Sequence, residues 1–225
     1  FALNETDFAA VDVAVIPPFT DLRSVQTLIE GDKYDIKYGA QDVSQYAKGA
    51  HTGDIAGSML SKLGCTYVLT GHSERRADHG ESSREVRAKA EAAHRAGLRA
   101  IICVGETAAE RKRGQTLKVI GKQLADSLPK GSTAKNTVVA YEPVWAIGTG
   151  LTPTVEDVAE VHASIRSRLR RRFRDDGAAM QLLYGGSVKG SNAAELMAVA
   201  NVNGALVGGA SLTAADFWPI VETCI

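Results

Sequence analysis

Short apolar segments recur along the chain at a mean spacing of about 32 residues, the size of a strand–helix unit. Most are near-continuous runs of hydrophobic residues rather than alternating ones, which is typical of strands buried on both faces of a parallel sheet. The predicted strands are 12–16, 36–40, 67–70, 100–104, 137–141, 180–184 and 204–207.

The segments between these runs carry helix start signals. Ser82 and Glu85 form a capping-box pattern that opens a helix ending near Gly97. Thr154, followed by Glu156 and Asp157, predicts a second helix start, because acidic residues suit the positive end of the helix dipole. By the same logic Thr213 with Asp216 opens the last helix, and Thr20 opens the first, which should end at Gly31.

Strict alternation of strands and helices indicates the α/β class with a parallel sheet. An open doubly wound sheet often carries a glycine-rich motif after its first strand, but Pro17, Pro18 and Phe19 stand there. Unusual residues instead follow five later strands, which favours a closed (β/α)₈ barrel whose chemistry collects at one face. They are Gly71–His72, Gly105–Glu106, Glu142–Pro143, Gly185–Ser187 and Gly208–Gly209.

Composition narrows the function. The chain of 225 residues carries 26 basic and 26 acidic side chains, so it shows no electrostatic signature for nucleic acid or a membrane surface. No apolar run is long enough to span a bilayer. The three Cys residues are far apart and odd in number, which fits a reducing, cytoplasmic setting and argues against a zinc site.

Two side chains are candidates for chemistry at the strand ends. Glu142 is followed by Pro143 and Trp145 in a loop with an apolar middle and a glycine-rich end, which could cover a substrate and exclude water. A lone Glu there could also be a solvated cap. His72 directly follows a strand, and a neutral imidazole there could donate a hydrogen bond to a carbonyl. Its alternative is a structural histidine.

The paired glycines after the last two strands suggest an anion site. Glycines let backbone N–H groups approach a ligand closely, and barrels often bind phosphate after their last two strands. Each pair alone could be an ordinary turn.

We interpret Cys103 as core packing. The arginines between Arg166 and Arg174 we interpret as a solvated helix end.

Six sequence motifs together give this chain a specific resemblance to a known family. In chain order they are GAHTGD at 49–54, GHSERR at 71–76, CVGET at 103–107, AYEPVWAIGTG at 140–150, YGGSV at 184–188 and LVGGASL at 206–212. Together they resemble the triosephosphate isomerase family, from about Asp12 onward. The resemblance implies interconversion of dihydroxyacetone phosphate and D-glyceraldehyde 3-phosphate, in glycolysis and gluconeogenesis, without a cofactor or metal.

The resemblance also implies residue roles. Glu142 would be the base, His72 the neutral electrophile, and Glu74 a third carboxylate that organises the site. The lid's first hinge would contain Pro143 and Trp145. The residues that would hold the substrate phosphate are Gly148, Ser187, Gly208 and Gly209.

A homodimer is implied as well. The segment 41–54 resembles the family's loop that inserts into a second subunit. Thr52 would approach the partner's active site, and Arg75 would pair with Asp54 of the second copy.

Two departures from the family pattern stand out. The second hinge reads Leu151–Thr152–Pro153 where the family often has Lys-Thr-Ala. The family's Asn-x-Lys strand, whose Lys assists catalysis, has no counterpart before Val11. We therefore expect a single barrel domain over 1–225 that lacks its first strand–helix unit. The alternatives are a catalytically impaired phosphate-binding barrel and another phosphate-binding barrel enzyme, such as a synthase.

Overall fold

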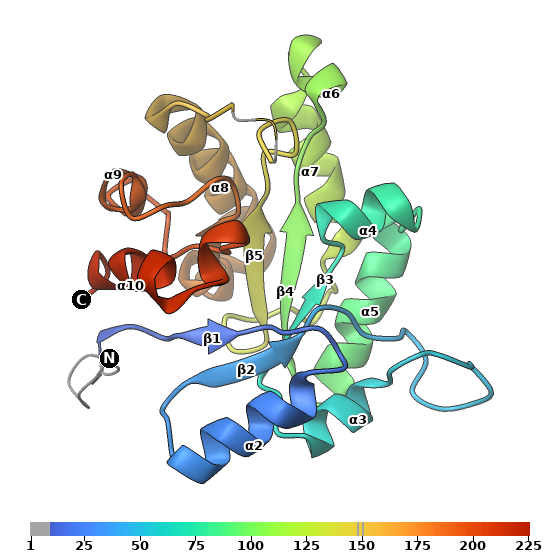
Figure 1. Ribbon diagram of the computed structural model, residues 1–225. Coiled ribbons are helices and arrows are strands. Elements are labelled where there is room, and N and C mark those ends of the chain that lie inside the picture. The colour runs from blue at the N-terminus through green and yellow to red at the C-terminus, as the bar shows by residue number, and fades with distance from the viewer. Residues whose placement is uncertain (1–9, 148, 150) are drawn as a thin grey trace.

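Six parallel strands form one curled sheet in the order β1 to β6, as the computed structural model shows (Figure 1). The structure describes residues 10–147, 149 and 151–225. The strands are β1 (Ala14–Val15), β2 (Lys37–Ala40), β3 (Tyr67–Thr70), β4 (Arg99–Val104), β5 (Thr137–Tyr141) and β6 (Gln181–Tyr184). Sequential order and parallel pairing throughout are the arrangement of a (β/α)₈ barrel, which confirms the predicted fold class.

Helices cover the outer face of this sheet (Figure 1). They are α2 (Leu22–Asp32), α3 (Gly57–Lys62), α4 (Ser73–Asp78), α5 (Ser83–Arg95), α6 (Ala108–Lys112), α7 (Thr116–Ser127), α8 (Val155–Ala179), α9 (Ala193–Met197) and α10 (Ala214–Glu222), with a 3₁₀ turn η1 (Gly209–Ser211). No helix in the described part of the chain is long and apolar enough to cross a membrane.

Helix starts follow the predicted caps in three of four cases. Ser82 and Thr154 each complete a capping box, and the Thr213 side chain accepts from the Asp216 N–H. The prediction for Thr20 is wrong. The N–H of Asp21 donates to the carbonyl of Pro18 at 3.0 Å, so a turn occupies residues 18–21 and α2 begins one residue after Asp21.

Alternate residues of each strand point into two different cores. One set packs under the helices, with Val68, Ile102 and Tyr141 among its fully buried members. The other set fills the inside of the curled sheet. Its buried members are Tyr67, Leu69, Ile101, Cys103, Val138 and Ala140. Because both faces of the sheet are buried, the strands read as continuous apolar runs. The prediction that Cys103 is a core residue is confirmed.

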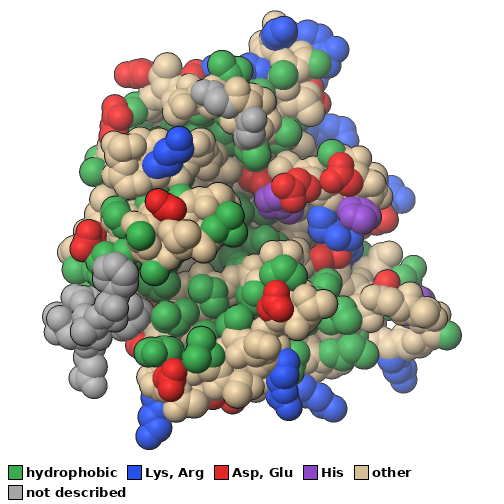
Figure 2. Space-filling view, viewed as in Figure 1, with side chains coloured by type: hydrophobic (Ala, Val, Ile, Leu, Met, Phe, Trp, Pro, Cys, Tyr) green, Lys and Arg blue, Asp and Glu red, His purple; other side chains and the backbone are tan. Residues whose placement is uncertain are grey.

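The inside of the sheet opens into a large cavity. It holds about 1770 Å³ and runs from the carboxyl ends of the strands down past Leu69, Ile101 and Leu183 to β1. Figure 2 shows the hollow from one side, with hydrophobic side chains on its floor. A small-ligand pocket is usually no larger than about 1,000 Å³. The cavity is larger because it includes the barrel interior.

The seventh predicted strand, 204–207, is shorter than expected. It makes one parallel bridge, between Ala205 and Tyr184 of β6. Positive φ at Asn201 and at Gly204, the first residue of the segment, bends the chain where the segment begins. Among the described residues β1 is paired only with β2, so the sheet has two edges, β1 and the 204–207 segment.

The arginines of α8 are not simply a solvated helix end, and that interpretation is wrong for Arg166. Arg166 is buried and donates to the carbonyls of Gly177 and Met180. Arg172 reaches the last carbonyls of α7, including Leu128 at 2.8 Å. Each arginine therefore satisfies carbonyls that a helix end leaves without partners, an arrangement that stabilises the packing of α8.

Candidate active site

Glu142 and His72 meet at the carboxyl end of the sheet. Glu142 directly follows β5, and His72 is the N-cap of α4, two residues after β3. The Nε2 of His72 lies 2.9 Å from Oε1 of Glu142. Ser73 donates to the same carboxylate twice, from its backbone N–H and its hydroxyl, each at 3.1 Å. The side chains predicted to carry the chemistry are thus in direct contact.

Hydrogen bonding defines the tautomer of His72. Its Nδ1 accepts from the backbone N–H of Glu74 at 3.4 Å, so the proton of a neutral ring lies on Nε2 and points at Glu142. Burial opposes a charge on the ring, but the hydrogen bond and charge of Glu142, with a further contribution from Glu74, raise the pKa of His72. A ligand that moved Glu142 away from Nε2 would remove this stabilisation and favour the neutral ring.

The carboxylate of Glu142 is enclosed, with 1% of the residue exposed. Glycines make room for it. A Cβ on Gly185 would lie 3.0 Å from Cγ of Glu142, and one on Gly105 would lie 1.8 Å from its backbone oxygen. The thiol of Cys103 lies beside the same group. Burial and then the charge of Glu142 raise the pKa of this thiol well above its usual value, so it stays a neutral neighbour.

The predicted phosphate residues line the same cavity as His72 and Glu142. Ser187, Gly208 and Gly209 all face it. A Cβ on Gly208 or Gly209 would meet no atom within 4 Å, so their backbone is open to a ligand. Gly148 lies outside the described residues. Figure 2 shows His and acidic side chains gathered on one rim of the hollow.

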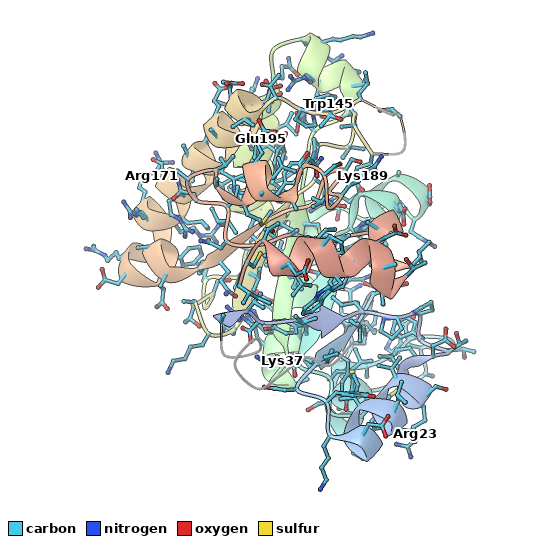
Figure 3. All side chains as sticks on the ribbon, turned by 60° about the vertical axis from the view of Figure 1, so that its left-hand side comes forward. Arg23, Lys37, Trp145, Arg171, Lys189 and Glu195 are labelled. Carbon is cyan, nitrogen blue, oxygen red and sulfur yellow. The ribbon has the colours of Figure 1, made fainter. Side chains whose placement is uncertain are left out.

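Trp145 lies at the carboxyl end of the sheet, at the opposite end from Lys37 (Figure 3). Its indole N–H donates to Oε1 of the fully buried Glu106 at 2.9 Å, and Tyr141 donates to the same oxygen at 3.3 Å. Burial raises the pKa of Glu106, and these donors oppose that effect. The first part of the predicted lid is therefore anchored to the barrel.

Of the residues predicted for the dimer contact, Thr52 and Asp54 lie in an exposed loop, and Arg75 lies in α4. Positions 46–54, which include Thr52, are exposed, and the loop extends away from the body between β2 and α3 (Figure 1). Asp54 accepts from the hydroxyl of Ser44 at 2.7 Å. Within its own chain Arg75 pairs with Asp42 at 3.0 Å and Glu81 at 2.6 Å.

No role was predicted for three groups that make clear contacts in the site. Ser73 holds Glu142, Glu106 holds Trp145, and Arg111 covers the Trp145 ring. Ser73 lies next to His72 in its motif, and Glu106 is among the unusual residues that follow the strands, so the motifs themselves were the available signal. Within the residues that the structure describes, no three His, Cys, Asp or Glu side chains gather so as to hold a metal ion.

Comparison with known proteins identifies this arrangement. The family model described as triosephosphate isomerase matches residues 2–224. The chain belongs to the triosephosphate isomerase family. A relative of that name from Bradyrhizobium diazoefficiens is 62% identical over 213 residues, which are 95% of this chain and 84% of the relative. The one from Rhodopseudomonas palustris is 61% identical over the same shares of both chains.

A solved structure supports the same assignment. The crystal structure of triosephosphate isomerase from Bartonella henselae matches with a TM-score of 0.89 at 44% identity, and the match covers 99% of this chain and 94% of that one. The activity of the triosephosphate isomerase family is isomerisation of a phosphorylated triose. The predicted family, fold class and enzyme class are therefore confirmed.

Proposed function

We propose that the chain interconverts dihydroxyacetone phosphate and D-glyceraldehyde 3-phosphate with Glu142 as the base. The observation that carries this assignment is the enclosed contact between Glu142 and His72 at the rim of a cavity that Ser187, Gly208 and Gly209 also line. A base, a hydrogen-bond donor and an anion site within one cavity are the parts that proton transfer next to a carbonyl requires.

The reaction moves one proton between two neighbouring carbons and a second proton between the oxygens bonded to them. The Glu142 carboxylate takes a proton from the carbon beside the carbonyl, and the electron pair moves toward the carbonyl oxygen to give an enediolate. The Nε2–H of His72 donates to this oxygen and stabilises its charge. Glu142 then returns its proton to the other carbon, while the hydroxyl on the first carbon gives its proton to the enediolate oxygen, so that a carbonyl forms at the first carbon and a hydroxyl at the second. In the structure Nε2 of His72 faces Oε1 of Glu142, so His72 must give up this contact before its Nε2–H can donate to the substrate oxygen.

Glu74 has an organising role in this scheme. Its side chain is 75% exposed, and its Oε2 lies 3.6 Å from Nδ1 of His72. The backbone N–H of Glu74, rather than its carboxylate, holds the ring of His72 in place. Ser187, Gly208 and Gly209, with Gly148, bind the phosphate, and Pro143 and Trp145 form the first hinge of the loop over the substrate.

Glu142→Gln tests this scheme. The amide cannot accept the proton, so we expect kcat to fall about 10³-fold or more with little change in KM. The measurement is a coupled isomerase assay. The same variant should lower the pKa of His72, followed by NMR, because the negative charge that raises this pKa is gone. Wild-type kcat in Glu142→Gln would remove Glu142 as the base.

We further infer that the enzyme is a homodimer. The exposed loop with Thr52 and Asp54 offers the extended surface that such a contact needs, and Arg75 lies beside its base. Light scattering should give about twice the mass of one chain, and the mass of a single chain at micromolar concentration would contradict the inference.

We also propose a glycolytic and gluconeogenic role in the cytoplasm, in keeping with the proposed activity. Recovery of the protein outside the soluble cytoplasmic fraction would argue against it.

A further inference from the structure

Arg76 of α4 holds the peptide groups on both sides of His72. Its backbone N–H donates to the carbonyl of His72 at 3.0 Å. Its side-chain Nε donates to the carbonyl of Gly71 at 2.8 Å. These carbonyls belong to the peptide bonds before and after His72. One residue, four positions along the chain, therefore fixes the backbone that carries the His72 ring.

The turn before His72 is closely packed against the same arginine. Gly71 joins β3 to His72 with a φ of 68°, a left-handed conformation that glycine adopts without strain. A Cβ at Gly71 would lie 2.6 Å from a methyl group of Val86 and 2.9 Å from Nη2 of Arg76. The carbonyl of Gly71 is buried in this turn, where an unpaired carbonyl would cost free energy, and Arg76 supplies its donor.

Three further groups fix the guanidinium itself. Its Nη2 donates to the carbonyl of Cys103 at 3.0 Å and to the hydroxyl of Ser127 at 3.1 Å. Its Nη1 donates to the hydroxyl of Ser83 at 3.2 Å. These partners lie in β4, at the end of α7 and at the start of α5. Arg76 thus ties the turn before His72 to a central strand and to two helices of the outer layer.

The ring of His72 is aimed by the same short segment. Its Nδ1 accepts from the backbone N–H of Glu74, in the first turn of α4. This contact does not involve Glu142, and none of the partners of Arg76 named above belongs to the loop after Glu142. The hold on His72 therefore persists when its Nε2 gives up Glu142 for the substrate oxygen.

We propose that Arg76 is a positioning residue for His72. The proposal rests on the role of His72 as the donor to the substrate oxygen, stated above. Arg76 lies outside the lining of the cavity and does not touch the substrate. It holds the peptide groups around His72 against β4 and α7, and thereby aims the imidazole. This placement matters because a donor that is fixed before the reaction stabilises the developing charge without having to reorient.

Arg76→Met is the first variant. We expect kcat to fall about tenfold, because the donor loses its exact placement but is still present. KM should change less than twofold, because the proposed phosphate contacts lie on other elements. Arg84→Met, at an exposed position in the first turn of α5, is the matched control and should leave kcat unchanged. Ser127→Ala removes one buried partner of the guanidinium but leaves the contacts around His72, so kcat should stay within twofold.

A double-mutant cycle separates positioning from general stability. His72→Ala removes the imidazole that Arg76 aims. In that background Arg76→Met should lower kcat by less than twofold further, because the donor is already gone. A merely structural role would give the same tenfold loss in both backgrounds.

NMR titration of His72 supplies a test that does not depend on turnover. Burial opposes a charge on this ring, but the hydrogen bond and charge of Glu142 outweigh burial and raise the pKa of His72 above 6.5. A ring that is no longer held loses both effects, so in Arg76→Met its pKa should move toward 6.5. Arg84→Met and Ser127→Ala should keep the value of the parent chain. A parent chain without turnover would count against the proposed function, and the titration would still decide whether Arg76 holds His72.

Arg76→Lys is the second variant and carries the same test if Arg76→Met does not fold. Lys keeps the charge but lacks the planar group that reaches several acceptors at once, so kcat should fall about threefold. Three results would overturn the proposal. One is a kcat and a His72 pKa in the Arg76 variants equal to those of Arg84→Met. Another is an equal loss of kcat with and without the His72 ring. The third is a loss of activity that follows a lowered Tm while the pKa of His72 stays that of the parent chain.

Discussion

The middle of the sheet and its two edges differ sharply in how well they are held. Every residue of β3 and β5 is buried, and β4 pairs with β5 through five residues. At one edge β1 has two residues, with Val15 37% exposed, and at the other the 204–207 segment makes one bridge. Glu142 and His72 follow central strands, whereas Ser187, Gly208 and Gly209 lie toward the second edge.

This difference separates two tasks of the site. Proton transfer requires the catalytic groups to be placed to within about 0.5 Å. Glu142 and His72 follow strands that have a neighbouring strand on both sides. Phosphate binding relies on several backbone N–H groups and tolerates more adjustment. The middle of the sheet therefore sets the geometry of the chemistry, and the edge supplies an adaptable anion site. The predictions that follow test this difference.

The largest expected effect is on stability, in the middle of the sheet. Ile102 of β4 is fully buried in the core under the helices. Ile102→Ala should lower the free energy of unfolding by about 3–4 kcal/mol, because it removes buried methyl groups and leaves a cavity. Val15→Ala on the edge should cost less than about 1 kcal/mol, since Val15 is already partly exposed. Urea unfolding of both variants is the measurement.

Equal losses in the two variants would show that the edge is as tightly packed as the middle. A loss below about 1 kcal/mol for Ile102→Ala would show that the core around β4 refills the cavity. Either result would remove the distinction between the two regions.

His162 links the middle to the edge and predicts acid sensitivity. It is buried on α8, 6.0 Å from the ring of Tyr141 of β5, and its Nδ1 donates to the carbonyl of Asn201, just before the 204–207 segment. Burial, with a contribution from the charge of Arg166, lowers the pKa of His162 from 6.5 to about 4. The unfolded chain therefore binds more protons than the folded one between these values.

Stability contributed by neutral His162 is present above pH 6.5 and is lost as the pH falls toward 4, up to about 3 kcal/mol. Urea unfolding between pH 7 and pH 4 measures it. His162→Gln should be less stable at pH 7 but should show a weaker pH dependence in this window, and His94→Gln provides a comparison at a second helical histidine. An unchanged pH dependence in His162→Gln would show that other groups cause the acid loss.

Much of the middle of the sheet could be predicted from the sequence. Strands β3 and β5 have the predicted bounds, because an apolar run buried on both faces has few other structures available. Glu142 and His72 were found for a related reason, since parallel strands bring their carboxyl ends to one face of a barrel.

The edge of the sheet and the long-range polar contacts were harder to predict from the sequence. The 204–207 run has a strand-like composition, but whether it pairs over several residues depends on a neighbour at each side. Arg166 and Arg172 look like a solvated helix end, because local spacing does not show which carbonyls the fold brings within reach of each guanidinium. The contact of Ser73 with Glu142 joins residues 69 positions apart, and only the fold reveals it.

The smallest effect is expected at the edge, from Ser187→Ala. Ser187 lines the same cavity as Glu142, and in our scheme its hydroxyl donates to the substrate phosphate. Loss of one such donor should raise KM about fivefold to tenfold, or about 1–1.4 kcal/mol, with kcat nearly unchanged. Inorganic phosphate, as a competitive inhibitor, should bind more weakly by a similar factor. Ser191→Ala is the matched control, because Ser191 is exposed and lies outside the lining of the cavity. If Ser187→Ala instead lowered kcat without affecting KM, the edge would take part in setting the geometry of proton transfer, and the division between the two regions would fail.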